Sequence, residues 1–517
     1  MTSQQQPKAA GWIETTACHV TSQIGAYRRS SLSAFSVTSR SKLRKIPSRD
    51  STPTMDYHLI IIGGGAAGKD AALFAARAGI KTLLVEKDQL GGTSYHRGCY
   101  AMRALQACAS AAKAAERSEE FGIGFGFFDT GWADWSLVRH RVTSRLTRQL
   151  TQDLTEAGIA VDFGTASFID NHQIQISDAS GKQKTLTAEN FIIATGSKPI
   201  YSGTLPVPLR GSHQSTLDYN TLNSDQLLEH ERIPKHILIV GAGYIGVEFA
   251  SIYRALGAKV TLIEEKERVL PAWDPLAGQK VAEQLINDGV TIHVNQPFNP
   301  NNLLQDTDLI LMATGRTGNT EGLGLENIGV KTTKFIEVTN QMQVYSEEFS
   351  NIFAIGDVNG MALLDSVAFT QARVAIQNIL GKPTLLNMHF IPQSIYTNPL
   401  IATVGFTQTD AYQFNQPIET IIDDVEAISN NNRSIIEPEK TTIKLLYQPE
   451  SNQLLGCLAI GPGATEIVNH TSFALYTESN IQKVLNAATV HPSPSEYFIR
   501  ALQKRFDPTL SRYVTNA

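Results

Sequence analysis

The chain has 517 residues, of which 42% are hydrophobic and 18% are charged, and this composition is that of a globular protein with enough chain for several domains. No apolar run approaches the ~18 residues that a membrane-spanning helix needs, so we expect no membrane span. The net charge of −5 divides into +6 for residues 1–54 and −11 for the remaining residues. The acidic body has no basic stripe and excludes a nucleic-acid partner. Four cysteines are too few for a disulfide scaffold and suit a reducing compartment.

Residues 1–54 are rich in serine and arginine and poor in acidic residues. This composition is typical of an organelle transit peptide. The alternative is that the natural start is Met55, because "MDYHLIIIGGG" looks like the beginning of a folded domain. We therefore expect a cytoplasmic protein, or an organellar one if this leader is a transit peptide.

One unit of the sequence occurs twice. The stretch "HLIIIGGGAAGKDAALFAARAGIKTLLVEK" begins at His58, and "HILIVGAGYIGVEFASIYRALGAKVTLIEE" begins at His236. The two stretches align without a gap. Each predicts a buried strand, a turn of the form G-x-G-x-x-G, a helix, and a second strand that ends in a glutamate.

Each part of this unit suits the binding of a dinucleotide. The first glycine turns the chain, the second lets the backbone approach a pyrophosphate, and the third lets the helix pack on the strand. The helix N-terminus attracts the phosphates, and the final carboxylate accepts hydrogen bonds from ribose hydroxyls. We therefore predict two dinucleotide sites, one at Gly63, Gly65, Gly68 and Glu86, and the other at Gly241, Gly243, Gly246 and Glu264.

The rest of the chain predicts strands of two kinds. The segments 191–199, 309–319 and 351–358 are apolar and end in glycine turns. After about residue 388, "IYTNPLIATVGFT", "TTIKLLYQ" and "LLGCLAIG" predict strands of a different sheet, and "ATEIVNHTSFALY" has the apolar spacing of a helix. We expect a separate C-terminal domain.

Several motifs together make residues 56–505 resemble the pyridine nucleotide–disulfide oxidoreductases, with dihydrolipoamide dehydrogenases and mercuric reductases as the most similar branches. The motifs are "GGGAAG", "GGT…GC", "ATGS", "GAGYIGVE", "ATGR", "AIGDV", "YTNPLIATVGFT" and "HPSPSE". The resemblance implies an α/β, glutathione-reductase-like fold, in which an NAD-binding Rossmann-like domain is inserted in an FAD-binding one and an α+β domain forms a homodimer. The expected domains are the leader (1–54), the FAD-binding domain (55–200 and 329–388), the NAD-binding domain (201–328) and the dimerisation domain (389–517).

The resemblance also implies which residues hold the cofactors. FAD is expected at the first unit and the nicotinamide nucleotide at the second. Tyr244 matches a tyrosine that covers the nicotinamide pocket, Glu248 matches a glutamate near the flavin, and Asp357 would hold the ribityl or phosphate region of FAD. Other expected cofactor contacts are Gly92, Thr93, Arg103, Gly164, Thr195, Gly196, Gly315 and Gly356.

The second unit favours NADH over NADPH. The carboxylate of Glu264 pairs well with a free 2′-hydroxyl and repels a 2′-phosphate. Enzymes that use the phosphorylated cofactor place an arginine nearby. Arg268 is close in sequence, but Glu265, Lys266 and Glu267 surround it without forming a basic cluster.

The sequence departs from the family at its redox centre. The family has C-x-x-x-x-C after "GGT", whereas this chain has Ser94 and Cys99 at those positions. A disulfide needs two sulfurs with Cα atoms within ~7 Å, so Ser94 cannot form one. Cys108 lies nine residues further along a predicted helix, ~13 Å away on the opposite face, and cannot substitute. We interpret Cys108 and Cys457 as small buried hydrophobic residues.

A single Cys99 leaves three possibilities open. Near a helix start its pKa could be lowered, so that a thiolate donates charge to the flavin. It could cycle through a sulfenic acid or a mixed disulfide, or it could only pack under the flavin.

Other positions differ from the family or agree with it. Arg103 replaces a lysine that approaches the flavin, and Leu400 replaces an acid. "HPSPSE" keeps His491 and Glu496, a pair in which the family's histidine enters from the partner subunit, moves protons, and has its tautomer fixed by the glutamate. We expect this pair still to move protons, or else to survive as part of the dimer interface. No metal-ligand spacing is legible in the sequence.

We therefore predict a homodimeric flavoenzyme that oxidises NADH through FAD and passes the electrons to an unknown acceptor other than a dithiol. The acceptor could be a quinone, a metal or oxygen, as in a diaphorase. It could be a second nucleotide, as in the soluble transhydrogenase, a relative that also lacks one of the two cysteines, or a peroxide or disulfide reached through Cys99. Dihydrolipoamide oxidation is disfavoured, because it needs both sulfurs. The alternative is a non-catalytic scaffold or redox sensor that binds flavin and NADH.

Overall fold

The computed structural model describes residues 55–116, 118–121, 123, 132–201, 206–208, 216–218, 220–230, 232–299, 307–408, 410, 417–427 and 439–506. The leader hypotheses fall on residues 1–54 and lie outside the described residues. The described part of the chain begins at Met55 and belongs to one compact unit.

The first repeat forms strand β1 (Tyr57–Ile62), helix α2 (Ala66–Arg77) and strand β2 (Thr82–Glu86). β1 pairs in parallel with β2 and with β6 (Gln183–Ile193), and Leu59, Ile60 and Ile61 are fully buried. A strand covered on both faces needs a continuous apolar run, and "LIII" provides one.

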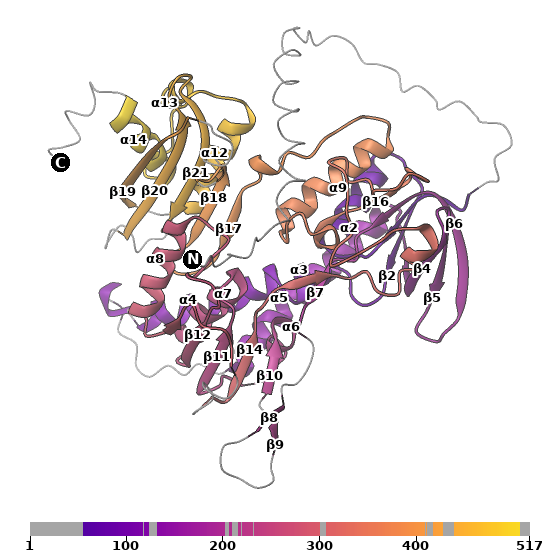
Figure 1. Ribbon diagram of the computed structural model, residues 1–517, viewed down its shortest axis with the longest axis horizontal. Helices are drawn as coiled ribbons and strands as arrows, with labels where there is room; N and C mark the ends of the chain where they lie inside the picture. The colour runs from indigo at the N-terminus through magenta and orange to yellow at the C-terminus, as the bar shows by residue number, and fades with distance from the viewer. Residues whose placement is uncertain are drawn as a thin grey trace, which may run out of the picture. The chain divides into compact units, whose positions relative to one another are not determined.

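Strand β16 (Ile352–Ala354) returns to this first sheet, where it pairs in parallel with β6. The sheet continues with the strands β3 (Ala160–Phe163), β5 (Gln173–Ser177) and β4 (Thr165–Asp170), in the order β3-β2-β1-β6-β5-β4. The helix that follows β16, α9 (Asp365–Ile379), packs beside α2 (Figure 1). The chain therefore leaves the first sheet, builds a second one, and returns.

The second repeat forms strand β11 (His236–Val240), helix α7 (Tyr244–Ala255) and strand β12 (Lys259–Ile263). These strands lie in a parallel sheet with the order β10-β14-β11-β12-β13. Its other members are β10 (Asn220–Asn223), β13 (Thr291–His293) and β14 (Leu309–Met312), and helix α8 (Pro275–Asn287) joins β12 to β13. The two repeats, which align without a gap in sequence, thus form the same succession of strand, helix and strand.

The third sheet is antiparallel and has the order β17-β18-β21-β20-β19. Its strands are β17 (Gln393–Ile395), β18 (Ile401–Gly405), β21 (Gln453–Ile460), β20 (Glu439–Gln448) and β19 (Glu419–Ala427). Helix α12 (Ala464–Tyr476) has the bounds that its apolar spacing predicts, and α14 (Ser495–Phe506) packs against it. Buried residues of both helices and of β20 and β21 share one core, so this region has a core of its own.

Further helices and strands connect these sheets. They are α3 (Gly92–His96), α4 (Cys99–Glu116), α5 (Trp132–Glu156), α6 (Ser224–Leu227), α13 (Ile481–Leu485), β7 (Ser197–Pro199), β15 (Arg316–Gly318), β8 (Pro206–Pro208) and β9 (Thr216–Asp218).

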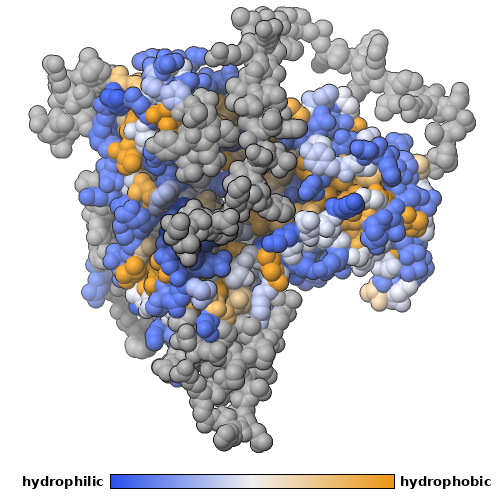
Figure 2. Space-filling model, in the orientation of Figure 1, coloured by the Kyte–Doolittle hydropathy of each residue, from blue (hydrophilic) through white to orange (hydrophobic). Residues whose placement is uncertain are grey.

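The face of the molecule in Figure 2 is mainly hydrophilic, with hydrophobic residues in scattered groups. Among the residues that the structure describes, no helix has the length and apolar character needed to cross a membrane.

Candidate flavin and nucleotide site

The glycines of the first turn fit three different needs. A Cβ atom on Gly63, whose φ is +106°, would lie 2.4 Å from the carbonyl oxygen of Ala194. A Cβ on Gly68 would lie 1.8 Å from the carbonyl oxygen of Gly63, so only glycine lets the helix approach the strand here. Around Gly65 the nearest atom would be 3.9 Å away, at Gly92. The middle glycine therefore opens onto free space, as a backbone that cradles a pyrophosphate must.

The second turn repeats this arrangement. A Cβ on Gly241 would lie 2.6 Å from the carbonyl oxygen of Ala313, and one on Gly246 would lie 1.9 Å from that of Gly241. A Cβ on Gly243 would have no protein atom within 4 Å. Both turns thus fit a dinucleotide.

The two predicted carboxylates make equivalent hydrogen bonds. Glu86 accepts from the backbone N–H groups of Gly64 (2.6 Å) and Asp88 (2.8 Å). Glu264 accepts from those of Ala242 (2.7 Å) and Lys266 (3.0 Å). Each carboxylate therefore ties the end of the second strand to the glycine turn, and its remaining lone pairs can accept ribose hydroxyls.

Arg268 is occupied by its own loop. Its guanidinium donates to the carbonyl oxygens of Leu270 (2.9 Å), Pro271 (2.8 Å) and Trp273 (2.9 Å). Arg268, the first arginine after Glu264, is thus held by backbone carbonyls.

The segment after "GGT" lies against the first glycine turn. A Cβ on Gly92 would come within 2.9 Å of the Cα atom of Gly65, so the two backbones are in close contact. α3 begins at Gly92 and carries Thr93, whose carbonyl oxygen accepts from the N–H of Arg97 at the end of that helix. Ser94 and Cys99 are thereby placed beside the first turn.

The Ser94 side chain points to a residue that sequence reasoning missed. Ser94 is buried, and its hydroxyl donates to Oδ2 of Asp365 at 2.9 Å. Asp365 is the first residue of α9, where an acid is ordinary because it faces the positive end of the helix dipole. No signal in the sequence therefore distinguished it.

Of the three possibilities left open for Cys99, the structure does not support the one that needs a lowered pKa. Although part of the residue is exposed, desolvation by the surrounding protein, together with the negative charges of Asp365, Glu248 and Asp357, raises the pKa of its thiol to about 12. The helix start at Cys99 is present as predicted, but desolvation, followed by the nearby carboxylates, raises the pKa of the thiol.

No disulfide joins the cysteines of the described region, because Cys99, Cys108 and Cys457 are all free. Cys108 lies on the same helix as Cys99, as predicted. Cys457 is buried in β21, which agrees with its interpretation as a small core residue, whereas Cys108 is half-buried.

Arg103 and Glu248 come close to one another but do not form an ion pair. The guanidinium of Arg103 lies over the ring of Tyr396, 3.8 Å from its centre, and donates to Gln106 Oε1 at 2.6 Å. Glu248 accepts from the backbone N–H of Tyr396 at 2.8 Å. Desolvation raises the pKa of Glu248 to about 7, while Tyr396 and Arg103 oppose the rise. Desolvation likewise raises the pKa of Tyr244 to about 12.

Asp357 ends a chain of polar contacts. Ser197 donates its hydroxyl to Asp357 at 2.6 Å and accepts from Arg316 Nε at 2.8 Å. Arg316 also donates to Asp225 at 3.2 Å. Desolvation raises the pKa of Asp357, and the Ser197 hydrogen bond and the Arg316 charge oppose this.

The remaining predicted residues lie at turns between these elements. Thr195 and Gly196 hydrogen-bond Asn319. The carbonyl oxygen of Gly315 accepts from the N–H of Ile200. These bonds join the segment that leaves the first sheet to the segment that returns to it. The backbone N–H groups of two glycines donate within the first sheet region, from Gly164 to the carbonyl oxygen of Glu86 at 2.8 Å and from Gly356 to Gln371 Oε1 at 2.6 Å.

His491 and Glu496 are paired as predicted. Nδ1 of His491 lies 2.9 and 3.1 Å from the two carboxylate oxygens, and the histidine side chain is 74% exposed. The glutamate can therefore fix the ring orientation, while Nε2 remains free for another group.

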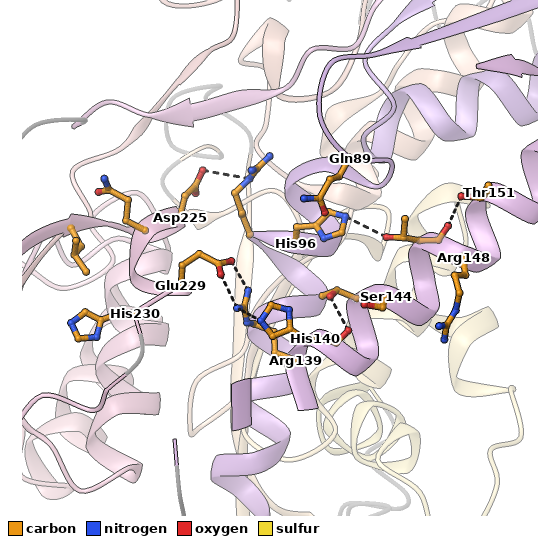
Figure 3. Close-up of a pocket in the computed structure, with 15 residues that line it drawn as sticks. Gln89, His96, Arg139, His140, Ser144, Arg148, Thr151, Asp225, Glu229 and His230 are labelled. Atoms are coloured by element: carbon orange, nitrogen blue, oxygen red, sulfur yellow. Dashed lines mark hydrogen bonds and ion pairs between the residues drawn. The ribbon is translucent and has the colours of Figure 1, made fainter. Parts of the chain in front are cut away.

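A separate cavity of about 1030 Å³ lies between α5, α6 and the end of α3 (Figure 3). Two of its cations face acids, because Arg139 makes two hydrogen bonds to Glu229 and Arg97 lies beside Asp225. It contains none of the predicted site residues. In the described part of the chain, no group of three or more His, Cys, Asp or Glu side chains could hold a metal ion.

Comparison with known proteins identifies the family. Residues 57–378 match the model of the pyridine nucleotide-disulphide oxidoreductases, and residues 391–502 match the model of their dimerisation domain. The chain belongs to the pyridine nucleotide-disulphide oxidoreductase family. It is an FAD-dependent oxidoreductase that binds a pyridine nucleotide, and its dimerisation domain indicates a homodimer.

Relatives with different names have similar sequence identity to this chain. The chain is 32% identical to a soluble pyridine nucleotide transhydrogenase of Pectobacterium atrosepticum, covering 86% of this chain and 97% of the relative. It is 30% identical to a dihydrolipoyl dehydrogenase of Bacillus subtilis, with the same coverage of both chains.

Solved structures confirm the predicted fold. LpdA from Mycobacterium tuberculosis is similar with a TM-score of 0.75 at 24% identity, and the HOCl-induced flavoprotein disulfide reductase RclA from Escherichia coli with a TM-score of 0.73 at 23% identity. Each comparison covers 86% of this chain and 99% of the other.

Proposed function

We propose that the protein oxidises NADH through FAD and passes the electrons to an acceptor that is not a dithiol. The observation that carries this proposal is the hydrogen bond from Ser94 to Asp365. Ser94 stands at the position that resembles the first redox cysteine of the family, and its buried hydroxyl is held by a carboxylate. A disulfide cycle cannot operate at this position without a second sulfur.

When bound, FAD accepts two electrons from NADH and releases them to the acceptor. In our proposal the FAD-binding domain consists of residues 55–200 and 329–388, and its first repeat positions the flavin. Gly65 lets the backbone approach the pyrophosphate, Glu86 accepts from the ribose, and Asp357 orients the ribityl or phosphate region. Further contacts are assigned to Gly63, Gly68, Gly92, Thr93, Arg103, Gly164, Thr195, Gly196, Gly315 and Gly356.

The nicotinamide nucleotide is assigned to the second repeat, within residues 201–328. Gly241, Gly243 and Gly246 form its cradle, and Tyr244 covers the nicotinamide pocket. We propose NADH over NADPH, because Glu264 would repel a 2′-phosphate and Arg268 is held by three backbone carbonyls.

The acceptor is proposed to take electrons from the flavin directly. A thiol with a pKa of about 12 supplies little thiolate at neutral pH, and this disfavours transfer through Cys99. His491 and Glu496 of residues 389–517 are proposed to serve proton transfer across the dimer. We propose the cytoplasm as the compartment, with an organelle as the alternative if residues 1–54 are a transit peptide.

The test is turnover of the FAD-loaded protein with NADH and four acceptors. These are lipoamide, ferricyanide, a water-soluble benzoquinone and thio-NAD. We expect no lipoamide reduction and clear reduction of at least one other acceptor, with Ser94→Ala unchanged as the matched control. Lipoamide reduction as fast as that of the other acceptors would contradict the proposal, and a flavin that NADH leaves oxidised would favour the scaffold or sensor.

A further inference from the structure

The cavity between α5, α6 and the end of α3 is a space that the cofactor assignments leave unused (Figure 3). Its volume of about 1030 Å³ lies at the upper end of the ~300–1,000 Å³ that is typical of small-molecule sites. None of the glycines and carboxylates assigned to FAD or to the nicotinamide nucleotide lines it. A ligand held here is therefore distinct from both cofactors.

The lining of this cavity is polar. Among the described residues that form it, Leu222 is the one aliphatic side chain, and no Phe, Tyr or Trp ring is present. A purine base binds to proteins largely by packing its ring against apolar or aromatic side chains. The lining therefore disfavours a nucleotide and favours a ligand that is polar over its whole surface.

The charges of the lining leave one cation in excess when the histidines are counted as neutral. Arg97, Arg139 and Arg148 face two carboxylates, those of Asp225 and Glu229. Arg139 donates to both oxygens of Glu229, at 2.8 and 3.1 Å, and Arg97 lies 3.9 Å from Asp225. Two of the three arginines are thus paired across the cavity, and Arg148 is the third.

Arg148 and Ser144 offer hydrogen-bond donors that the described part of the protein leaves unused. Neither side chain makes a hydrogen bond or an ion pair with another described residue, although both line the cavity. They are four positions apart on α5 and therefore lie on the same face of this helix. A phosphate group carries three acceptor oxygens and about two negative charges, which a guanidinium fork and a hydroxyl can bind together.

The opposite wall has a different chemistry. Figure 3 shows Ser144 and Arg148 on α5 on one side, and Asp225 and Glu229, from α6 and the residues after it, on the other. A free anion would be repelled by these two carboxylates, whereas hydroxyl groups can donate hydrogen bonds to them. A molecule with a phosphate at one end and hydroxyl groups at the other would satisfy both walls.

We propose that this cavity binds a phosphorylated sugar or polyol. Arg148 and Ser144 hold its phosphate, and its hydroxyl groups donate to Asp225 and Glu229. Arg139, which is only 3% exposed, is a positioning residue because its two hydrogen bonds fix the Glu229 carboxylate. The inference goes beyond the proposed function, in which no step of electron transfer uses this cavity.

The decisive experiment is a calorimetric titration of the FAD-loaded protein. The probes are glycerol 3-phosphate, ribose 5-phosphate and glucose 6-phosphate, compared with inorganic phosphate, glucose and AMP. We expect at least one of the first three to bind about tenfold more tightly than inorganic phosphate, because hydrogen bonds to charged groups add to the phosphate contact. Glucose should give no binding heat, and AMP should bind no more tightly than inorganic phosphate.

Two variants of α5 test the phosphate contact. Arg148→Gln should weaken the tightest of the three ligands about tenfold, because it removes a charge-assisted hydrogen bond. Arg145→Gln is the matched control, since Arg145 is exposed on the same helix but does not line the cavity. The control should change the affinity by less than about twofold, because salt screens an exposed charge. FAD content and ferricyanide reduction with NADH should stay the same in both variants, which shows that they fold.

Glu229→Gln tests the opposite wall. It removes a repelling charge and releases Arg139, so inorganic phosphate should bind about tenfold more tightly. The preference for the sugar or polyol phosphate over inorganic phosphate should become smaller, because a neutral amide is a weaker acceptor for hydroxyl groups.

Three results would overturn the inference. The first is that none of the three phosphorylated compounds binds more tightly than inorganic phosphate, and the second is that AMP binds more tightly than all of them. The third is an equal loss of affinity in Arg148→Gln and Arg145→Gln, which would indicate attraction by the general surface charge. These titrations contain no NADH, so their outcome does not depend on the proposed function.

Discussion

The hydroxyl of Ser94 donates a 2.9 Å hydrogen bond to Oδ2 of Asp365, although 271 positions separate the two residues. The bond places a carboxylate beside the position where the family resemblance leads one to expect a thiol. The same carboxylate contributes to the raised pKa of Cys99. The side chains at positions 94 and 99, where a disulfide cycle would need its two sulfurs, thus both lie near the negative charge of Asp365.

A sulfur placed at position 94 should not by itself create a redox-active disulfide. In Ser94→Cys the new thiol would lie beside Asp365, and a like charge disfavours the thiolate that disulfide exchange requires. We expect the variant to retain two free thiols at 94 and 99 and to reduce lipoamide no faster than wild type. Mass spectrometry of the denatured, alkylated protein counts these thiols.

The matched double variant is Ser94→Cys with Asp365→Ala. Removing the carboxylate should allow a disulfide to form, so that the thiol count falls by two relative to the single variant. A disulfide that forms equally well in the single variant would show that Asp365 does not oppose it.

The reactivity of Cys99 should be low at neutral pH. With a pKa of about 12, its alkylation by iodoacetamide rises about tenfold per pH unit from pH 7 to 10, without a plateau. Asp365→Asn removes one negative charge and should speed alkylation at pH 8 by about tenfold. The rate is followed by the mass of the peptide that contains residue 99, and a plateau below pH 9 in wild type would contradict this account.

Two of the three glycines in the second turn, Gly243 and Gly246, should respond differently to the same change. Gly243→Ala meets no protein atom within 4 Å and has an ordinary backbone conformation, so folding and FAD content should be unchanged. NADH affinity should fall at least about tenfold, because the methyl group occupies the cradle. Gly246→Ala would place Cβ 1.9 Å from the carbonyl oxygen of Gly241 and should destabilise the fold by about 1–3 kcal/mol. Calorimetric titration and thermal unfolding measure the two effects, and equal destabilisation would contradict the prediction.

A buried ion pair links the C-terminal sheet to helix α8. Lys444 on β20 contacts Asp274, the N-cap residue of α8, at 2.8 Å, and both side chains are nearly inaccessible. Lys444→Met leaves a buried charge without its partner and should lower the free energy of unfolding by about 3–5 kcal/mol. Lys504→Met, which breaks the more exposed pair with Asp423, should cost less than about 1 kcal/mol. Similar losses in denaturant unfolding for the two variants would contradict this difference.

The sequence predicts what is local and periodic in this protein. Both glycine turns, their flanking strands and helices, and the helix at 464–476 follow from patterns within short segments. The pairing of His491 with Glu496 is predicted by its motif. The contacts of Ser94 with Asp365 and of Arg103 with Tyr396 depend on side chains from elements far apart in sequence, and no pattern marks them. The raised pKa of Cys99 could not be read from the sequence for the same reason, because the helix start is local whereas the desolvation and the carboxylates that raise the pKa come from elements far apart in sequence.

The most direct test of the central claim is an anaerobic titration of the FAD-loaded protein with NADH, followed from 400 to about 700 nm, for wild type and Cys99→Ala, because charge transfer from a thiolate to the flavin would add a long-wavelength band. The account predicts that NADH bleaches the flavin equally in both proteins and that no long-wavelength band depends on Cys99. A band that is present in wild type and absent from Cys99→Ala would contradict it, because the single sulfur would then be an active thiolate.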